Sequence, residues 1–133
     1  MGKGIFAGAR QWLVAGLLGA ACVLAVLPVA ARQAAPGVST AISVDELPSD
    51  GRSTYVLIRQ GWPFAHEKDG SVFGNYERQL PVQRRGYYRE YTVRTPGAHS
   101  RGARRIVCGG AQRAPDVCYY TSDHYSSFRR IAP

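Results

Sequence analysis

The sequence predicts an α+β fold, in which one short N-terminal helix packs on a twisted antiparallel sheet of about five strands. Helix signals occur around residues 50–60. From residue 71 onward, short runs rich in Val, Ile, Tyr, Phe and Thr alternate with Gly, Pro, Asp and Asn. Consecutive strands joined by short loops favour antiparallel pairing. We therefore expect the helix to cover one face of the sheet and to leave the other face open.

The first segment, residues 1–31, predicts a signal peptide. Lys3 and Arg10 supply a positive start, and the residues that follow carry no charge up to Ala31. Pro28 and the small residues after it are typical of a signal-peptidase site, so we expect cleavage after Ala31. An uncleaved membrane anchor is the alternative, because about 20 apolar residues can span a bilayer.

The charge balance indicates a polyanionic partner. The chain has 133 residues, with 17 Lys and Arg against 9 Asp and Glu, and a net charge of +8. Loss of Lys3 and Arg10 with the signal peptide leaves 15 basic residues against 9 acidic ones, so the domain itself keeps a charge of +6. A composition of 45% hydrophobic and 20% charged residues excludes a disordered acidic tail, a collagen repeat and a coiled coil. Nucleic acid, an anionic membrane or an acidic protein remain as partners.

Export makes the cysteines interpretable. Cys22 leaves with the signal peptide, so Cys108 and Cys118 remain. Two cysteines in an exported domain are expected to form a disulfide, with two free thiols as the alternative. His and Cys residues of metal-ligand spacing do not surround this pair, so the sequence predicts no metal site and no cofactor.

The mature chain begins with a predicted flexible lead over residues 32–41, because Gly, Pro, Ser and Thr are frequent there. The folded domain is expected to occupy residues 42–133. A helical turn near Val44–Leu47 is the first element that we expect in it.

The main helix is expected at residues 50–60. Ser49 and Asp50 are the residue types that cap a helix N-terminus. Apolar residues follow at helical spacing. Gly61 is expected to end the helix, and Pro63 prevents it from resuming.

The strands are expected to carry polar side chains on one face and apolar ones on the other. Glu90 alternates with Tyr91, so the two point to opposite faces of the sheet. By the same alternation, Ile106 faces the helix-covered core and Arg105 faces the open side. The open side is then a basic, tyrosine-rich surface. The predicted strands are Ser71–Asn75, Tyr87–Arg94, Ala103–Cys108, Val117–Thr121 and Ser127–Ile131.

The polar residues of these strands could cleave RNA without a metal. A carboxylate such as Glu90 can take the proton of the attacking 2′-OH, and the imidazolium of His124 can give one to the leaving oxygen. Arginines such as Arg101 and Arg105 can hold the phosphoryl oxygens. Arg104 has the opposite strand parity and is expected to be structural. Each residue alone also fits a salt bridge, a turn or a solvated surface.

Long stretches of the chain are similar to a known family. They read GWPFAHEKDGSVFGNYE, GYYREYTVRTPGAHSRGARRIVCGG and CYYTSDHYSSF, in that order and spacing. The chain resembles the secreted microbial guanyl-specific ribonucleases, the family of barnase and the small Streptomyces guanyl ribonucleases. The resemblance covers residues 61–131 closely and the preceding helix region more loosely.

The resemblance implies a role for each candidate residue. The general base of the family falls on Glu90 and its general acid on His124. Its phosphate-binding arginines fall on Arg101 and Arg105. Tyr125, next to the acid, matches a family tyrosine that contacts the phosphate.

The base-binding loop of the family falls on residues 73–77. One carboxylate can accept both N1–H and N2–H of guanine, and Glu77 is the candidate for it. Phe73 and Tyr76 can stack on the base, although barnase has an arginine where this chain has Tyr76. Backbone N–H groups of the loop can meet guanine O6, since Gly and Asn permit the backbone angles required. The predicted binding residues are therefore Phe73, Gly74, Asn75, Tyr76, Glu77 and Tyr125.

The implied activity is that of a secreted, metal-independent endoribonuclease. It would cleave single-stranded RNA 3′ of guanosine through a 2′,3′-cyclic phosphate and hydrolyse this to a 3′-phosphate. The alternative is a non-catalytic RNA- or inhibitor-binding module on the same fold. We further expect a monomer without stable membrane association after signal cleavage. A small acidic barstar-like inhibitor is an expected partner, and a toxin role remains open beside a nutritional one.

Overall fold

The computed structural model describes Gly2, Gly16, residues 35–61 and residues 63–133. The chain divides into two units, residues 1–31 and residues 32–133. Apart from the two glycines, the predicted signal peptide lies outside the described residues, as do the first residues of the predicted lead. Among the helices that the structure describes, none is long and apolar enough to cross a membrane.

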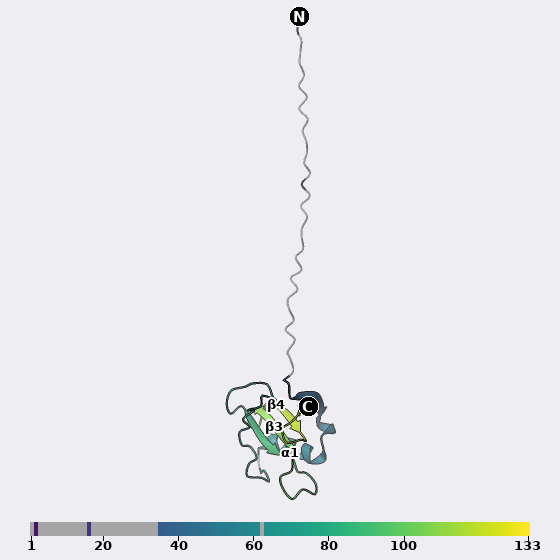
Figure 1. Cartoon of the computed structure of the whole chain (residues 1–133), viewed down its shortest axis with the longest axis vertical. Helices are drawn as coiled ribbons and strands as arrows, with labels where there is room; N and C mark the ends of the chain where they lie inside the picture. The colour runs from purple at the N-terminus through teal and green to yellow at the C-terminus, as the bar shows by residue number, and fades with distance from the viewer. Residues whose placement is uncertain (1, 3–15, 17–34, 62) are drawn as a thin grey trace. The chain divides into compact units, whose positions relative to one another are not determined.

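The second unit is one helix against a five-stranded sheet with the strand order β1-β5-β4-β3-β2 (Figure 1). The neighbours β2–β3, β3–β4 and β4–β5 are antiparallel, and β1 runs parallel to β5. The predicted α+β class with about five strands is confirmed. The elements are β1 Val38–Ser43, the 3₁₀ helix η1 Val44–Glu46, α1 Ser49–Gln60, β2 Tyr88–Thr92, β3 Arg105–Gly110, β4 Pro115–Thr121 and β5 Phe128–Ala132.

Strand β1 corrects the prediction of a flexible lead over residues 32–41. Val38 pairs with Phe128, and Ile42 pairs with Ile131 in the core of the domain. The Arg129 guanidinium also donates to backbone carbonyls of β1. Among the residues that the structure describes, β1 pairs with β5 alone, and β5 comes about 90 residues later in the chain. The residues next to β1 in the sequence therefore gave no indication that it forms a strand.

The predicted strand Ser71–Asn75 is also wrong in its extent. Only an isolated bridge forms, between Val72 and Arg89, with Glu90 N–H donating to the Ser71 carbonyl at 2.9 Å. The left-handed backbone of Asn75, with φ of 50°, then turns the chain away from β2. This segment therefore starts a loop beside the sheet instead of adding a full strand.

Helix α1 ends as predicted but starts differently. Gly61 has a left-handed φ of 87°, and its N–H donates to the Leu57 carbonyl at 2.8 Å. The N-cap is Pro48, whereas Ser49 is already helical and makes no side-chain cap. The preceding turn η1 has the capping box instead, in which Ser43 N–H donates to the Glu46 carboxylate at 2.8 Å.

Two clusters of buried side chains lie on the two faces of the sheet. On the first face, Tyr55 and Ile58 of α1 pack against Tyr91, Ile106 and the disulfide between Cys108 and Cys118. Glu90 and Arg105 point the other way, so the predicted alternation and the predicted disulfide are both confirmed. The second cluster consists of Leu80, Tyr88, Val107, Tyr119 and Phe128.

The second cluster means that the face away from α1 is partly covered. Leu80, in the loop before β2, is completely buried there, and the Tyr88 hydroxyl donates to the Pro81 carbonyl at 2.6 Å. Phe73 and Tyr125 pack against the edge of this cluster. The loop over residues 73–87 is thereby fixed beside β2, next to Glu90.

Candidate active site

Glu90 lies in the middle of β2, and both oxygens of its carboxylate accept hydrogen bonds. The Tyr125 hydroxyl donates to Oε2 at 2.7 Å, and the Arg101 guanidinium donates to Oε1 at 3.4 Å. The side chain keeps 15% of its surface exposed. Each carboxylate oxygen has a second lone pair, so Glu90 can still accept a proton from a ligand.

Arg101 is fixed to β2 by polar groups on one side of its guanidinium. Nε and Nη2 donate to the Thr92 hydroxyl at 3.1 and 2.8 Å. The carboxylate of Asp69 lies 4.0 Å from Nη2 and also accepts from Thr92 N–H at 2.7 Å. The Asp69 side chain is only 4% exposed. Its contribution was missed by the sequence reasoning, because the pair Asp69-Gly70 has the signature of a plain turn.

Arg105 is buried, with 2% of its surface exposed, and it supports the loop that precedes β3. Its Nη1 donates to the carbonyls of Arg104 and Gly102 at 2.7 and 3.0 Å. Its guanidinium lies 5.9 Å from the centre of the Tyr125 ring. The Nε atom is buried and has no hydrogen-bond partner. Nη1 of Arg105 therefore supports the loop, while its Nε–H donor has no partner and the guanidinium lies beside Tyr125.

His124 and Tyr125 follow β4 in consecutive left-handed conformations, with φ of 53° and 72°. Such a backbone costs about 1–2 kcal/mol per non-glycine residue and is concentrated at functional sites. His124 N–H donates to the Ala103 carbonyl at 3.0 Å, and Tyr125 N–H donates to the Thr121 hydroxyl at 3.2 Å. The turn exposes the His124 side chain and half-buries that of Tyr125.

Asp123 holds this turn closed. Its carboxylate accepts from the Ser127 N–H at 2.9 Å, from the Ser127 hydroxyl and from the Thr121 hydroxyl at 2.8 Å. Partial burial opposes the charged form, but these hydrogen bonds outweigh it and keep the pKa of Asp123 below its ordinary value. The ionised form of Asp123 is therefore the form that fits the turn.

Tyr125 contacts both Glu90 and Phe73, which belongs to the loop predicted to bind the base. Its ring stacks on Phe73 with centroids 5.0 Å apart. Burial, and to a smaller extent the hydrogen bond to Glu90, raises the pKa of Tyr125 to about 12. The hydroxyl consequently keeps its proton at neutral pH and remains a donor to Glu90.

The loop of residues 73–77, which is predicted to bind the base, is braced by Asn75. Its side-chain amide donates to the Leu80 carbonyl at 3.0 Å, and its amide oxygen accepts from Leu80 N–H at 3.1 Å. A Cβ on Gly74 would collide with the Tyr76 ring, so glycine is needed for this ring position. Tyr76 is 91% exposed, and Glu77 is exposed as well. The two side chains are therefore available to a ligand.

A single cavity of about 470 Å³ joins these parts. Residues 73–77 line one part of it, and Glu90, His124 and Tyr125 line the other. Arg101 and Arg105 do not line the cavity, but they contact its walls at Glu90 and Tyr125. A volume of this size is within the range of small-ligand sites, about 300–1,000 Å³.

The sequence profile of the ribonuclease family matches residues 30–132. The chain belongs to this ribonuclease family. Guanyl-specific ribonuclease Sa of Kitasatospora aureofaciens is 47% identical to it over 71% of this chain and 95% of its own length. Guanyl-specific ribonuclease Sa3 of the same organism is 54% identical over 64% of this chain, in an alignment that spans 58% of Sa3.

Solved structures similar to this ribonuclease contain nucleotides. Ribonuclease Sa2, solved in complexes with mononucleotides, is 41% identical, with a TM-score of 0.66 over 71% of this chain and 96% of its own. Another Sa2 structure, with guanosine-2′-cyclophosphate, gives 41% identity and a TM-score of 0.65, with coverage of 71% and 98%. The fold that carries the cavity of this ribonuclease is therefore one that accommodates guanine nucleotides in a relative.

Proposed function

We propose that this ribonuclease cleaves single-stranded RNA on the 3′ side of guanosine, by transphosphorylation followed by hydrolysis. The observation that carries the proposal is the single cavity of about 470 Å³, which Glu77, Glu90 and His124 all line. Glu77 would recognise the base of a bound nucleotide. Glu90 and His124 would transfer protons at its phosphate, in the same cavity.

Guanine is assigned to the part of the cavity lined by residues 73–77. The Glu77 carboxylate can accept from N1–H and N2–H together, whereas adenine has an acceptor at N1 and is repelled. Phe73 and the exposed Tyr76 offer aromatic surface to the base. Selection against adenine follows, because adenine leaves the Glu77 carboxylate without its donors and places an acceptor opposite it.

The first chemical step is an in-line transphosphorylation. Glu90 takes the proton of the guanosine 2′-OH, the 2′-oxygen forms a bond to phosphorus, and the bond from phosphorus to the leaving 5′-oxygen breaks. His124 gives its proton to that 5′-oxygen. Glu90 must be ionised and His124 protonated at the start, so the dependence of the rate on pH is bell-shaped.

The second step reverses the proton transfers. His124 takes a proton from water, and the water oxygen forms a bond to phosphorus. The bond from phosphorus to the 2′-oxygen breaks, and Glu90 returns a proton to that oxygen, which leaves a 3′-phosphate. Arg101, which donates to Glu90, and Arg105, whose guanidinium lies beside Tyr125, contribute positive charge that stabilises the charge developing on the phosphoryl oxygens. The nucleophile in the first step belongs to the substrate, so DNA is not a substrate.

We also propose that the protein acts outside the cell after removal of residues 1–31. The disulfide between Cys108 and Cys118 supports this, since disulfides persist in oxidising compartments. In this proposal the mature enzyme is a monomer and does not associate stably with membranes. A small acidic inhibitor of the barstar type would protect the cytosol, and its charge would complement the basic domain.

The decisive experiment incubates the purified protein with GpU and with ApU in the presence of EDTA. We expect guanosine 2′,3′-cyclic phosphate from GpU and little product from ApU, as read by chromatography. Glu90→Gln and His124→Ala should each lower kcat/KM for GpU by about 10²–10⁴-fold, because each removes one proton transfer.

The matched control is Glu67→Gln, which makes the same substitution at an exposed residue outside the cavity and should keep full activity. Urea unfolding shows whether each variant is folded. Full activity of either site variant contradicts the proton-transfer roles, and a requirement for a divalent metal contradicts the mechanism. Binding of RNA without cleavage would favour a non-catalytic module instead.

A further inference from the structure

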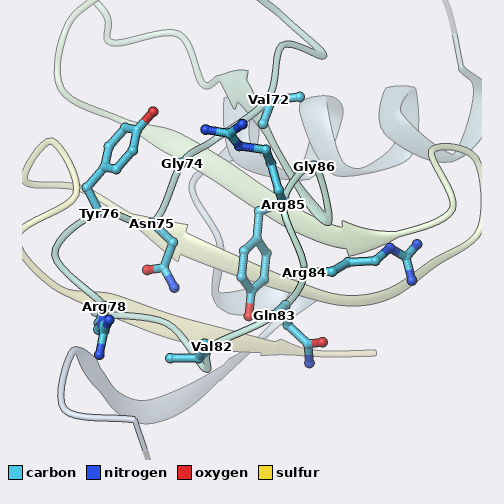
Figure 2. Close-up of a pocket in the computed structure, with 11 residues that line it drawn as sticks. Val72, Gly74, Asn75, Tyr76, Arg78, Val82, Gln83, Arg84, Arg85 and Gly86 are labelled. Atoms are coloured by element: carbon cyan, nitrogen blue, oxygen red, sulfur yellow. The ribbon is translucent and has the colours of Figure 1, made fainter.

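A second cavity, of about 350 Å³, lies on the other side of the base-binding loop (Figure 2). It shares Val72, Gly74, Asn75 and Tyr76 with the active-site cavity, so the loop is the wall between the two. Glu90 and His124 do not line it. This second cavity is therefore next to the guanine position but separate from the proton-transfer pair.

The lining of the second cavity is basic. Arg78, Arg84 and Arg85 line it, and no Asp or Glu does. Among the residues that the structure describes, ion pairs involve Arg101 alone of the arginines, so these three guanidiniums have no carboxylate partner there. Three unneutralised guanidiniums around one cavity favour an anionic ligand.

The same cavity also presents apolar surface. Val72, Tyr76 and Val82 line it and are 50%, 91% and 71% exposed, which makes them unusually open for large hydrophobic side chains. A simple anion would have no use for such surface. A nucleotide has both parts, because its base can stack on an aromatic ring and its phosphate can bind a guanidinium.

The side chains are arranged for one phosphate and one base. In Figure 2 the Arg85 guanidinium extends toward Val72 and Gly74, at the base-binding loop. Arg84 extends away from the loop, and its guanidinium lies 5.7 Å from the centre of the Tyr87 ring. Arg85 is thus the arginine placed to meet a phosphate close to the loop, and Tyr76 is the ring on that loop.

We propose that this second cavity binds the nucleotide that precedes the guanosine in the RNA chain, with its phosphate on Arg85 and its base against Tyr76. The inference rests on the proposed cleavage after guanosine. The nucleotide that follows the guanosine must lie at the leaving oxygen, beside His124, and His124 does not line this cavity. The RNA that enters it is therefore the chain on the 5′ side.

The test compares the substrates GpU, UpGpU and GpUpU on the wild-type protein, Arg85→Gln and Arg113→Gln. The wild type should cleave UpGpU with a kcat/KM about three- to tenfold above that for GpU, because one exposed charged contact and one stacked base are added. In Arg85→Gln this ratio of UpGpU to GpU should be smaller than in the wild type, because the phosphate contact is lost while the base can still stack on Tyr76. Arg113→Gln removes the same charge from an exposed arginine that lines neither cavity and should keep the wild-type ratio.

A binding measurement separates this inference from the proposed reaction. Calorimetric titration with deoxyguanosine 3′-phosphate and with the same compound extended by a 5′ thymidylate involves no cleavage. The extended compound should bind more tightly than deoxyguanosine 3′-phosphate to the wild type and to Arg113→Gln, and this gain in affinity should be smaller in Arg85→Gln.

Equal kcat/KM for UpGpU and GpU in the wild type would overturn the inference while leaving the cleavage reaction intact. An Arg85→Gln effect on GpUpU instead of UpGpU would place the contact on the 3′ side and also overturn it. Absence of any cleavage of GpU would refute the proposed function, and the titrations would then decide whether the second cavity still distinguishes the extended compound.

Discussion

Arg101 and Arg105 hold their guanidinium groups in different ways, although the resemblance assigns both to the phosphate. Arg101 is 27% exposed and is held by side chains on β2. Arg105 is buried and donates to carbonyls of the loop before β3. Arg101 is consequently a group that a ligand can engage at little cost to the fold, whereas Arg105 belongs to the fold and to the site together.

Replacing Arg105 by Ala should lower both stability and activity. The carbonyls of Gly102 and Arg104 would lose a charged donor at a buried position, so we expect a loss of about 2–4 kcal/mol in the free energy of unfolding. Urea unfolding measures it. Arg104→Ala is the matched control, because Arg104 makes no side-chain hydrogen bond among the described residues and should change stability by less than about 1 kcal/mol. Equal losses in the two variants would contradict the loop-support role of Arg105.

Single residues were predictable where their position in a strand decides their direction. Alternation along β2 and β3 was enough to place Glu90 and Arg105 on the face of the sheet that Tyr91 and Ile106 do not occupy. Asp69 was not predictable in this way. Its carboxylate accepts from Thr92 N–H, 23 residues further along the chain, and no local pattern reports a contact of that separation.

At the scale of elements, the turn from Thr121 to Ser127 determines where His124 lies. Two consecutive left-handed residues are retained there because the Thr121 hydroxyl accepts from Tyr125 N–H and the Asp123 carboxylate accepts from Ser127 N–H. The Asp123 carboxylate is thus a positioning group for the proposed acid, although it does not line the active-site cavity.

Asp123→Asn should lower stability at neutral pH and much less in acid. Since folding lowers the pKa of Asp123, its ionised form stabilises the fold above the ordinary value of 3.8 and this stabilisation is lost as the pH falls below that value. Urea unfolding at about pH 7 and about pH 3 should show a difference from wild type that shrinks in acid. Asp45→Asn, which changes an exposed carboxylate with no hydrogen bond among the described residues, should show no such trend. A difference that is constant with pH would contradict the role of the ionised form.

Elements that carry their own end signals were predictable. Gly61 ended α1 where expected, and the four later strands, β2 to β5, were all located to within about two residues of their bounds. The strand before β2 was not, since Asn75 turns the chain after one bridge. Strand β1 was missed because its stability comes from pairing with β5 and not from its own six residues.

For the whole molecule, the disulfide joins β3 and β4 at a directly paired position, Cys108 and Cys118. Replacement of both cysteines by Ala should lower the free energy of unfolding by about 3 kcal/mol, because the cross-link shortens the unfolded chain by a loop of about ten residues. Urea unfolding of oxidised wild type and of the double variant measures this difference. A difference close to zero would mean that the cross-link does not restrict the unfolded chain.

The two-sided core was only half predictable. The face packed on α1 follows from alternation along the strands. The second cluster depends on Leu80 and Phe73, which come from a loop without periodicity. That loop also makes the wall between the two cavities, so the part of the fold that sequence patterns describe least is the part to which we assign base recognition.

The parallel pair β1–β5 has a consequence for the order of events during synthesis. Strand β5 lies between β1 and β4 in the sheet, yet it is the last strand of the domain to be made. Until Phe128–Ala132 leave the ribosome, β1 has no neighbour and the second core lacks its central phenylalanine. Completion of the sheet therefore waits for β5, the last of the described strands to be synthesised, and β1 can take its final place only at that point.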